Sequence, residues 1–326
     1  MKTFINIVCL FFSVFYFSQS DRLKGNWILD DIVYTNGTQL EINHPQFSKF
    51  IEYNFNGNRI KSNNQSFKMT LSENLISTNF IKLNFKFEND YLVITEVGDD
   101  KIYYFLKNKT YLEKHPEFQP QKINFENKEV FVVNEIIKPD FINEKSFEIF
   151  LRENIPSFSN ESIKNNYFEA KFILTANNKI SNIIITKGIS ENFDNEFKTA
   201  LLKSEKYLIN NFHKDILITQ SFNFFKMFAG INSKNERIIS NIYEKGRVFY
   251  EKNDFENAKK TYSKINEIII NQDLKNRFGY NIDQIYINLG ISYLASNEIQ
   301  KSCESFRKVG DETNFKVRNY LKKFCK

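Results

Sequence analysis

The stretch FEIFLRENIP (residues 147–156) lies near the start of the segment 143–228. This segment decides the fold of the central part of the 326-residue chain. Its apolar side chains recur at helical spacing until a proline ends the run. Asn143 is expected to cap this helix, because an asparagine side chain can accept hydrogen bonds from the first-turn amides. The sequence therefore predicts a capped amphipathic helix that ends at Pro156.

Two strands, a second helix and a third strand are predicted to follow. Apolar and polar residues alternate in Tyr167–Leu174, which is the pattern of a half-buried strand. Residues 177–179 (Asn-Asn-Lys) supply a tight turn, and Ile180–Lys187 returns as the second strand of a hairpin. An apolar stripe over 192–208 predicts the second helix, and 216–225 predicts the last strand.

This order of elements, with its short motifs, resembles the C-terminal domain of TonB-type energy transducers. The motifs are Phe150-Leu151-x-x-Asn154-Ile155-Pro156, Ala170-Lys171-Phe172-Ile173 before Lys179-Ile180-Ser181-Asn182, Lys187-Gly188-Ile189-Ser190, and Phe222-x-Phe224. The paired glycines and the tyrosine–proline common before the hairpin in that family are absent, so the chain resembles a diverged member. The resemblance implies a two-helix, three-strand α+β domain over residues 141–229 that binds an extended partner segment along a sheet edge.

The last strand is expected to be that edge. Its candidate partner-binding residues share the face opposite Ile216, Ile218 and Phe222, and they are Leu217, Thr219, Ser221 and Asn223. By resemblance, the partner is a protein of the cell envelope, such as an outer-membrane receptor. The alternative is an edge already covered by residues 129–137 or by a second copy of the chain, because exposed edges are normally protected.

Residues 21–117 contain short aromatic or β-branched runs between turn signals such as Asn36-Gly37 and Asn56-Gly57. This spacing predicts an antiparallel barrel or meander, with a sandwich or an open sheet as alternatives. Gly25-Asn26-Trp27 resembles the Gly-x-Trp start of lipocalin-like domains, in which the tryptophan closes one end of the barrel. That resemblance implies a site for a small apolar ligand in the lumen of the barrel. The alternative is an interior filled by phenylalanine side chains. Residues 118–140 are then a linker or an added strand.

Residues 234–326 carry an internal repeat. Ile242, Gly246, Ala258, Tyr262 and Ile265 match Tyr286, Gly290, Ser302, Phe306 and Val309 at identical offsets. The pattern resembles tetratricopeptide repeats, which form helical hairpins, and it implies that the helices of each hairpin approach closely at Gly246 and Gly290. The glycines are 290 − 246 = 44 residues apart, about ten more than in the standard repeat. The surplus is expected near 270–282 as a longer loop or extended helices, and 314–325 is expected to be a capping helix.

Residues 1–20 have the features of a cleaved signal peptide: Lys2, an apolar run over 4–17, and Ser18-Gln19-Ser20 as a small-x-small cleavage site. A retained anchor, or a lipoprotein site at Cys9, is the alternative. Export places the chain in the periplasm, outside the cell or on its surface. Cleavage leaves Cys303 and Cys325 as the remaining cysteines, which predicts a disulfide between them in an oxidising compartment.

Catalytic, metal-binding and cofactor-binding motifs are missing from the sequence. His44 and His115 each precede a proline and are expected in loops, and Asp30-Asp31 and Asp99-Asp100 are expected in solvated turns. A net charge of +6, with no basic block interleaved with aromatics, does not favour nucleic acid as a partner. No later segment is apolar enough to span a membrane.

These observations predict a multidomain α+β chain: an antiparallel β domain, a TonB-like α+β domain and tetratricopeptide-like helical hairpins. The expected function is non-enzymatic protein–protein interaction after export. One alternative is a TonB-type energy transducer, although that family also needs a spanning anchor and a long proline-rich spacer, and this chain has 5 prolines. The other alternative is a carrier of a small apolar ligand in the β domain.

Overall fold

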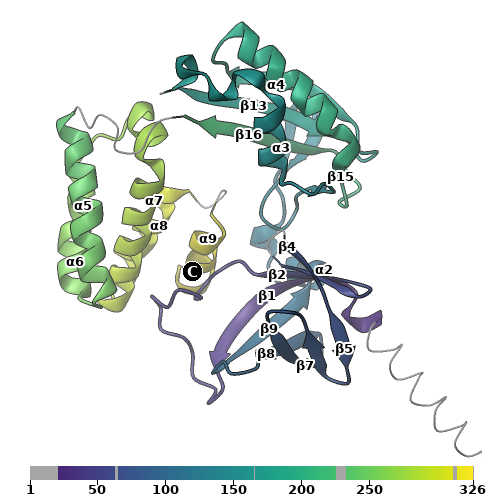
Figure 1. The fold of residues 1–326 in the computed structure, drawn as a ribbon. Coiled ribbons are helices and arrows are strands. Elements are labelled where there is room, and N and C mark those ends of the chain that lie inside the picture. The colour runs from purple at the N-terminus through teal and green to yellow at the C-terminus, as the bar shows by residue number, and fades with distance from the viewer. Residues whose placement is uncertain (1–20, 63–64, 165, 225–232, 311–313, 326) are drawn as a thin grey trace, which may run out of the picture. The chain divides into compact units, whose positions relative to one another are not determined.

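The structure, a computed structural model, describes residues 21–62, 65–164, 166–224, 233–310 and 314–325. The predicted signal peptide, residues 1–20, lies outside the described residues. The chain divides into two compact units, Met1–Gln119 and Pro120–Lys326. The first is built on an antiparallel sheet, whereas the second combines a smaller sheet with helices (Figure 1). The expected multidomain α+β organisation is confirmed at this level.

The described part of the first unit forms one 9-stranded antiparallel sheet with the order β4-β3-β2-β1-β9-β8-β7-β6-β5. The strands are β1 (Gly25–Tyr34), β2 (Glu52–Asn56), β3 (Arg59–Ser62), β4 (Gln65–Lys68), β5 (Thr70–Ser72), β6 (Leu75–Ser77), β7 (Lys82–Glu88), β8 (Tyr91–Glu96) and β9 (Lys101–Lys107). Helix α2 (Asn108–Lys114) and the 3-10 turn η1 (Pro116–Phe118) follow. The expected antiparallel β architecture is therefore confirmed.

The sheet is nearly closed because one run of chain carries both of its ends. β4 and β5 occupy opposite ends of the strand order, yet only Met69 separates them in sequence. β4 pairs with β3, and β5 pairs with β6 on the other side of the sheet. We call this bent run, residues 65–72, the seam.

Aromatic side chains fill the interior of this sheet. Trp27, Phe55, Phe85 and Phe105 are all buried, with Trp27 at the start of β1 only 3% exposed. The indole Nε1 of Trp27 donates to the carbonyl of Leu23 at 2.6 Å. This satisfies the polar atom of the ring while its apolar surface packs against Phe87, with ring centroids 6.0 Å apart.

The expectation of solvated turns is wrong for Asp30 and Asp31, which both lie inside strand β1, and the expectation of a simple loop is incomplete for His115. Asp30 lies inside β1, not in a turn, and its side chain is 6% exposed. His115 does lie outside the helices, between α2 and η1, but it is 8% exposed and contacts Asp30. Asp30 and His115 can both be buried because each provides a polar contact for the other. The two residues are far apart in the sequence, so their sequence neighbours do not predict this contact.

The second unit begins with a mixed sheet of 5 strands in the order β10-β11-β16-β13-β14. Its strands are β10 (Lys122–Phe125), β11 (Lys128–Val132), β13 (Tyr167–Leu174), β14 (Ile180–Lys187) and β16 (Ile216–Asn223), with α3 (Phe147–Asn154) and α4 (Glu191–Ser204) as its helices. A small pair, β12 (Asp140–Phe141) and β15 (Leu208–Ile209), lies outside this sheet. The sheet exceeds the three expected strands because residues 118–140 contribute a hairpin, which is the added-strand alternative.

The predicted cap of α3 is wrong by three residues. The Ser146 hydroxyl accepts from the Ile149 amide at 3.3 Å and caps the helix. The Asn143 side chain instead accepts from the Lys145 amide at 3.0 Å. A cap must immediately precede the first helical residue, here Phe147, so Asn143 lies too far upstream and forms a turn.

The two faces of the five-stranded sheet differ. Phe168 and Phe222 lie on the face that packs against Phe193 and Phe197 of α4, with ring centroids from 4.6 to 6.2 Å apart. On the opposite face, Val130, Ile173 and Leu217 form a smaller buried cluster. The alternation predicted for β13 therefore reflects burial mainly on the helix side.

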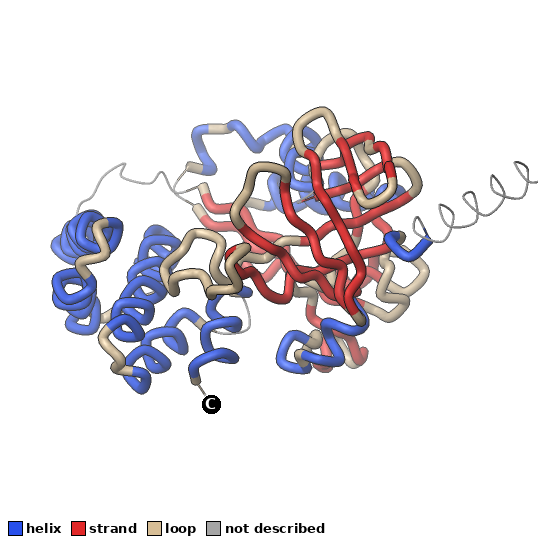
Figure 2. The backbone as a smooth tube through the Cα atoms, turned by 90° about the horizontal axis from the view of Figure 1, so that it is seen from below, coloured by secondary structure: helices blue, strands red, loops and turns tan. Residues whose placement is uncertain are grey.

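The described residues after 233 form α5 (Lys234–Glu251), α6 (Phe255–Tyr262), η5 (Ser263–Glu267), α7 (Gln272–Ala295), α8 (Ile299–Val309) and α9 (Phe315–Phe324). Figure 2 shows this part as helices joined by loops, and α5 lies beside α6 as α7 lies beside α8 in Figure 1. A Cβ added at Gly246 would lie 2.2 Å from the Tyr262 ring, and one at Gly290 would lie 2.5 Å from the Phe306 ring. The predicted close approach at both glycines is confirmed. The surplus residues of the second repeat lengthen α7.

The predicted cysteine pair is also found. The Sγ atoms of Cys303 in α8 and Cys325 after α9 lie at bonding distance, 2.02 Å. Phe306 and Tyr320 stack between the same two helices with centroids 4.9 Å apart. Among the described residues, no helix combines the length and apolar character needed to cross a membrane.

Candidate functional site: the partly open edge of strand β16

Strand β16 is an interior strand, so the prediction that it forms the sheet edge is wrong along part of its length. On one side it pairs with β13 throughout, from Leu174↔Ile216 to Tyr167↔Asn223. On the other side it pairs with β11 in parallel, through Ile216 and Leu217. The alternative in which residues near 129–137 cover the edge therefore holds for the first part of β16.

The cover ends because the chain turns away after β11. The Val133 amide donates to the Leu217 carbonyl at 3.2 Å, and among the described residues this is the last backbone hydrogen bond that β16 receives on this side. The Asn134 side chain then accepts from the amides of Ile136 and Ile137 at 2.9 and 2.8 Å. An asparagine that binds the amides two and three residues ahead forms a turn, and this turn directs the chain out of the sheet.

The backbone of β16 beyond Leu217 continues to present polar groups on the β11 side. Asp215 and Leu217 direct their carbonyls toward β11, where Phe131 and Val133 donate to them. Alternate residues of a strand direct their backbone groups to the same side, so Thr219 and Ser221 point this way too. Both residues are exposed. We call residues 219–223 the open edge.

The open edge lies between an apolar and a polar surface. On the helix side, the Phe158 ring contacts Phe222 and Phe224 at centroid distances of 5.1 and 4.9 Å, and Phe158 and Phe224 are partly exposed. On the opposite face, Tyr167 donates to the Glu169 carboxylate at 3.0 Å. Burial raises the pKa of Tyr167, so this phenol remains a neutral donor at physiological pH.

The four residues predicted from the sequence divide between covered and open positions. Leu217 is 3% exposed, and its carbonyl already binds Val133. Thr219, Ser221 and Asn223 are exposed, but the Asn223 side chain donates to the Asn276 carbonyl of α7 at 2.5 Å. Phe158 could not be predicted as part of this site, because a single aromatic residue after Pro156 carries no signal of its position beside β16.

The opposite edge of the sheet, β14, is less suited to pairing with another strand. Its register with β13 shifts twice, and Asn182 adopts a positive φ of 50°. The Glu205 side chain also accepts from the Ile180 amide at 2.8 Å. Bulges and occupied amides of this kind protect a sheet edge against an incoming strand.

No group of three or more His, Cys, Asp or Glu residues in the described chain is arranged to hold a metal ion. The geometry of the open edge instead offers backbone donors and acceptors beside partly exposed rings. Backbone groups at the edge of a sheet are the kind that pair with an extended polypeptide.

Comparisons of the chain with protein-family models, with curated proteins and with solved structures give no match.

Proposed function

We propose that this chain is an exported, non-enzymatic protein-binding protein of the cell envelope, whose five-stranded sheet takes up an extended segment of a protein partner at the open edge. In this proposal the sheet with α3 and α4 is a diverged TonB-like domain. Helices α5–α8 are tetratricopeptide-like hairpins, and the first unit is lipocalin-like.

The observation that carries the proposal is the partial cover of β16. β11 occupies the position beside Ile216 and Leu217, while Thr219 and Ser221 are exposed and direct backbone groups to the same side. A strand entering beside residues 219–223 would continue the line of β11 and extend the sheet. Backbone pairing of this kind accepts many sequences, and the neighbouring side chains select among them.

Backbone pairing alone is too weak to account for specific binding. A hydrogen bond contributes about 1 kcal/mol net, so the few bonds that residues 219–223 can form supply only a few kcal/mol. The partly exposed rings of Phe158 and Phe224 offer the additional apolar contact. We therefore expect the partner segment to place an apolar side chain on the helix side of the sheet and polar side chains on the other.

A photo-crosslinking side chain at Thr219, introduced into the whole chain in its native envelope, tests the proposal. The matched control is a crosslinker at Lys203, an exposed position on α4. We expect a discrete protein adduct from position 219 that position 203 does not give. Equal adducts from both positions would show that binding is not localised at the open edge.

Two substitutions at one residue separate backbone pairing from side-chain contact. Ser221→Pro removes the amide that faces the open side, while Ser221→Ala keeps it. We expect the proline to reduce the adduct at position 219 at least tenfold and the alanine to leave it nearly unchanged, with circular dichroism confirming that both variants fold. If the proline variant is unfolded, Phe158→Ser provides the second test. Undiminished crosslinking in a folded proline variant rules out the open edge.

A further inference from the structure

Glycine follows asparagine at two places in this chain, at Asn36-Gly37 and at Asn56-Gly57. Both pairs lie in turns of the first unit, and all four residues are exposed. In such a pair the backbone nitrogen of the glycine can attack the side-chain carbonyl carbon of the asparagine, because glycine has no Cβ to obstruct the approach. The two pairs have the same sequence and are both open to water, so their contacts decide how readily each reacts.

The first pair is held by three hydrogen bonds. The Asn36 Oδ1 atom accepts from the Thr38 amide at 3.0 Å and from the Thr38 hydroxyl at 2.7 Å. The Gly37 amide, which would be the attacking group, donates to the Tyr34 carbonyl at 2.8 Å. Attack at this pair requires these bonds to break, because the Asn36 side chain must rotate toward a nitrogen that is already engaged.

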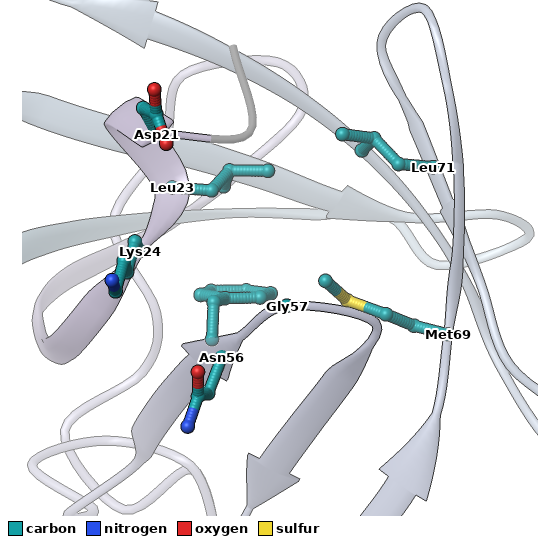
Figure 3. A pocket seen from close by; sticks show the side chains of 8 residues that line it. Asp21, Leu23, Lys24, Asn56, Gly57, Met69 and Leu71 are labelled. Carbon is teal, nitrogen blue, oxygen red and sulfur yellow. The ribbon is translucent and has the colours of Figure 1, made fainter. Parts of the chain in front are cut away.

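The second pair is free of such contacts. Among the described residues, neither the Asn56 side chain nor the Gly57 amide forms a hydrogen bond. In Figure 3 the Asn56 side chain points away from the apolar side chains of Leu23 and Met69. Apart from its chain neighbours, no atom lies within 4 Å of the position that a Cβ would take at Gly57. Both reacting groups are therefore unobstructed.

The second pair also lies at the end of the ladder between β2 and β3. Asn56 pairs with Arg59, and these are the last paired residues before the turn. Gly57 has a φ of 57°, in the left-handed region that glycine adopts at little cost. The Asn58 carbonyl accepts from the Met69 amide of the seam at 2.8 Å. The seam therefore anchors the turn through Asn58 and leaves the two reacting groups free.

We propose that Asn56 is a site of spontaneous covalent modification, at which the Gly57 nitrogen closes a ring on the Asn56 side chain, while Asn36 is protected. The nitrogen forms a bond to Cγ of Asn56, and the side-chain NH₂ group leaves as ammonia with the proton that the Gly57 nitrogen gives up. Water then opens the cyclic imide at either carbonyl carbon, which yields aspartate or isoaspartate. Water is the only other reactant, and the site is independent of the open edge of β16.

The two products have different effects on the pairing of β2 with β3. An aspartate keeps the main chain intact and places a carboxylate directly opposite Arg59, which itself faces Lys68. Opposite charges at facing positions stabilise a pair of strands. Isoaspartate moves the side-chain methylene into the main chain, so β2 becomes one atom longer and loses its register with Arg59. The isoaspartate form should therefore unfold at a lower urea concentration than the aspartate form.

The test compares the two pairs within one molecule. The folded chain is incubated and digested, mass spectrometry follows the replacement of NH₂ by OH in each peptide, and an isoaspartyl methyltransferase labels isoaspartate. We expect Asn56 to react at least about tenfold faster than Asn36, because each hydrogen bond that must break slows attack by about fivefold. In concentrated urea, where both turns are unfolded, the two rates should become equal.

Three outcomes would overturn the proposal. They are equal rates in the folded chain, faster reaction at Asn36, and an unchanged mass at both pairs. A tenfold difference that persists in urea would also overturn it, because the cause would then be the neighbouring sequence and not the folded contacts.

Two substitutions assign the effect to named groups. Thr38→Ala removes the hydroxyl that donates to Asn36, so it should accelerate the reaction at Asn36 about fivefold and leave that at Asn56 unchanged. Asn56→Gln is the control for the assignment, because the longer side chain must close a larger ring and its peptide should keep its mass. The fluorescence of Trp27, a buried residue of the same unit, reports that the variants are folded. An unchanged rate at Asn36 in folded Thr38→Ala would contradict protection by these contacts.

Discussion

Asp30 shows how a buried carboxylate joins distant residues of the first unit. Its carboxylate lies 2.5 Å from His115 Nε2, and it accepts from Lys114 Nζ at 2.7 Å and from the Tyr91 hydroxyl at 2.8 Å. Burial by itself raises the pKa of Asp30, but the hydrogen bonds from His115, Lys114 and Tyr91 outweigh it and hold this pKa well below its usual range. The charged carboxylate therefore ties the segment around α2 to β1 and β8.

The lowered pKa of Asp30 predicts a loss of stability in acid. The folded pKa lies below the unfolded value of 3.8, so the contribution is complete above about pH 4 and is lost as the pH falls further. Asp30→Asn should lower the free energy of unfolding by about 2 kcal/mol at neutral pH and should weaken its dependence on pH below 4. Urea unfolding followed by Trp27 fluorescence at pH 7 and pH 3 measures both effects.

The matched control is Asp31→Asn, at the neighbouring and only partly buried position in β1. We expect this change to alter the free energy of unfolding by less than about 0.5 kcal/mol. Equal losses from the two substitutions would contradict a specific role for the Asp30 contacts.

Each of the two helical hairpins contains a glycine that faces an aromatic ring, but the hairpins differ at one buried position. Gly246 faces Tyr262 and Gly290 faces Phe306. Ala258 and Ser302 occupy equivalent positions of the repeat, and both are fully buried. The Ser302 hydroxyl has no hydrogen-bond partner among the described residues. A buried hydroxyl without a partner costs free energy that the alanine of the first hairpin does not.

Two substitutions in the second hairpin should change the free energy of unfolding in opposite directions. Ser302→Ala should stabilise the helices by about 1 kcal/mol, because it removes the unpaired hydroxyl. Gly290→Ala should destabilise them by about 1–3 kcal/mol, because the new Cβ would lie 2.5 Å from the Phe306 ring. Urea unfolding followed by circular dichroism at the helix band measures both.

Gly279 provides the control for the glycine substitution. It lies in α7 as Gly290 does, but no atom lies within 4 Å of its Cβ position. Gly279→Ala should therefore stabilise the helix by up to about 1 kcal/mol, through helix propensity alone. Destabilisation at both glycines would show that contact with the facing ring is not the cause.

At the scale of the whole molecule, the two units carry separate probes. The single tryptophan lies in the first unit, while the disulfide and helices α5–α9 lie in the second. Fluorescence therefore follows the first unit, and circular dichroism at the helix band follows mainly the second. Units with their own cores unfold in separate transitions unless a large interface couples them.

Reduction of the disulfide should affect one of these transitions. A bond between residues 22 apart stabilises a folded chain by about 3 kcal/mol on the loop-entropy estimate. A reductant should lower the urea midpoint of the helix signal and leave that of the Trp27 signal in place. Thiol labelling of the denatured, unreduced, cleaved chain should find no reactive cysteine. Two reactive thiols, or equal shifts in both signals, would contradict these expectations.

The sequence by itself determined the local elements and the repeat. Alternation over Tyr167–Leu174 and Ile180–Lys187, with asparagines between them, predicted the hairpin of β13 and β14 at its observed position. Identical offsets around Gly246 and Gly290 predicted the close approach of each helix pair. These features depend on the periodicity and size of side chains that are near in sequence, so they can be recognised without the fold.

Only the tertiary structure decided the state of Asp30 and the neighbours of β16. Asp30 is buried by partners from β8 and from the segment around α2. Strand β11 pairs with β16, although β11 precedes α3 in the sequence and β16 follows α4. Side-chain periodicity indicates which face of a strand is buried. It does not indicate which strand lies at its edge, because the hydrogen-bonding groups of that edge belong to the backbone and are the same at nearly every residue.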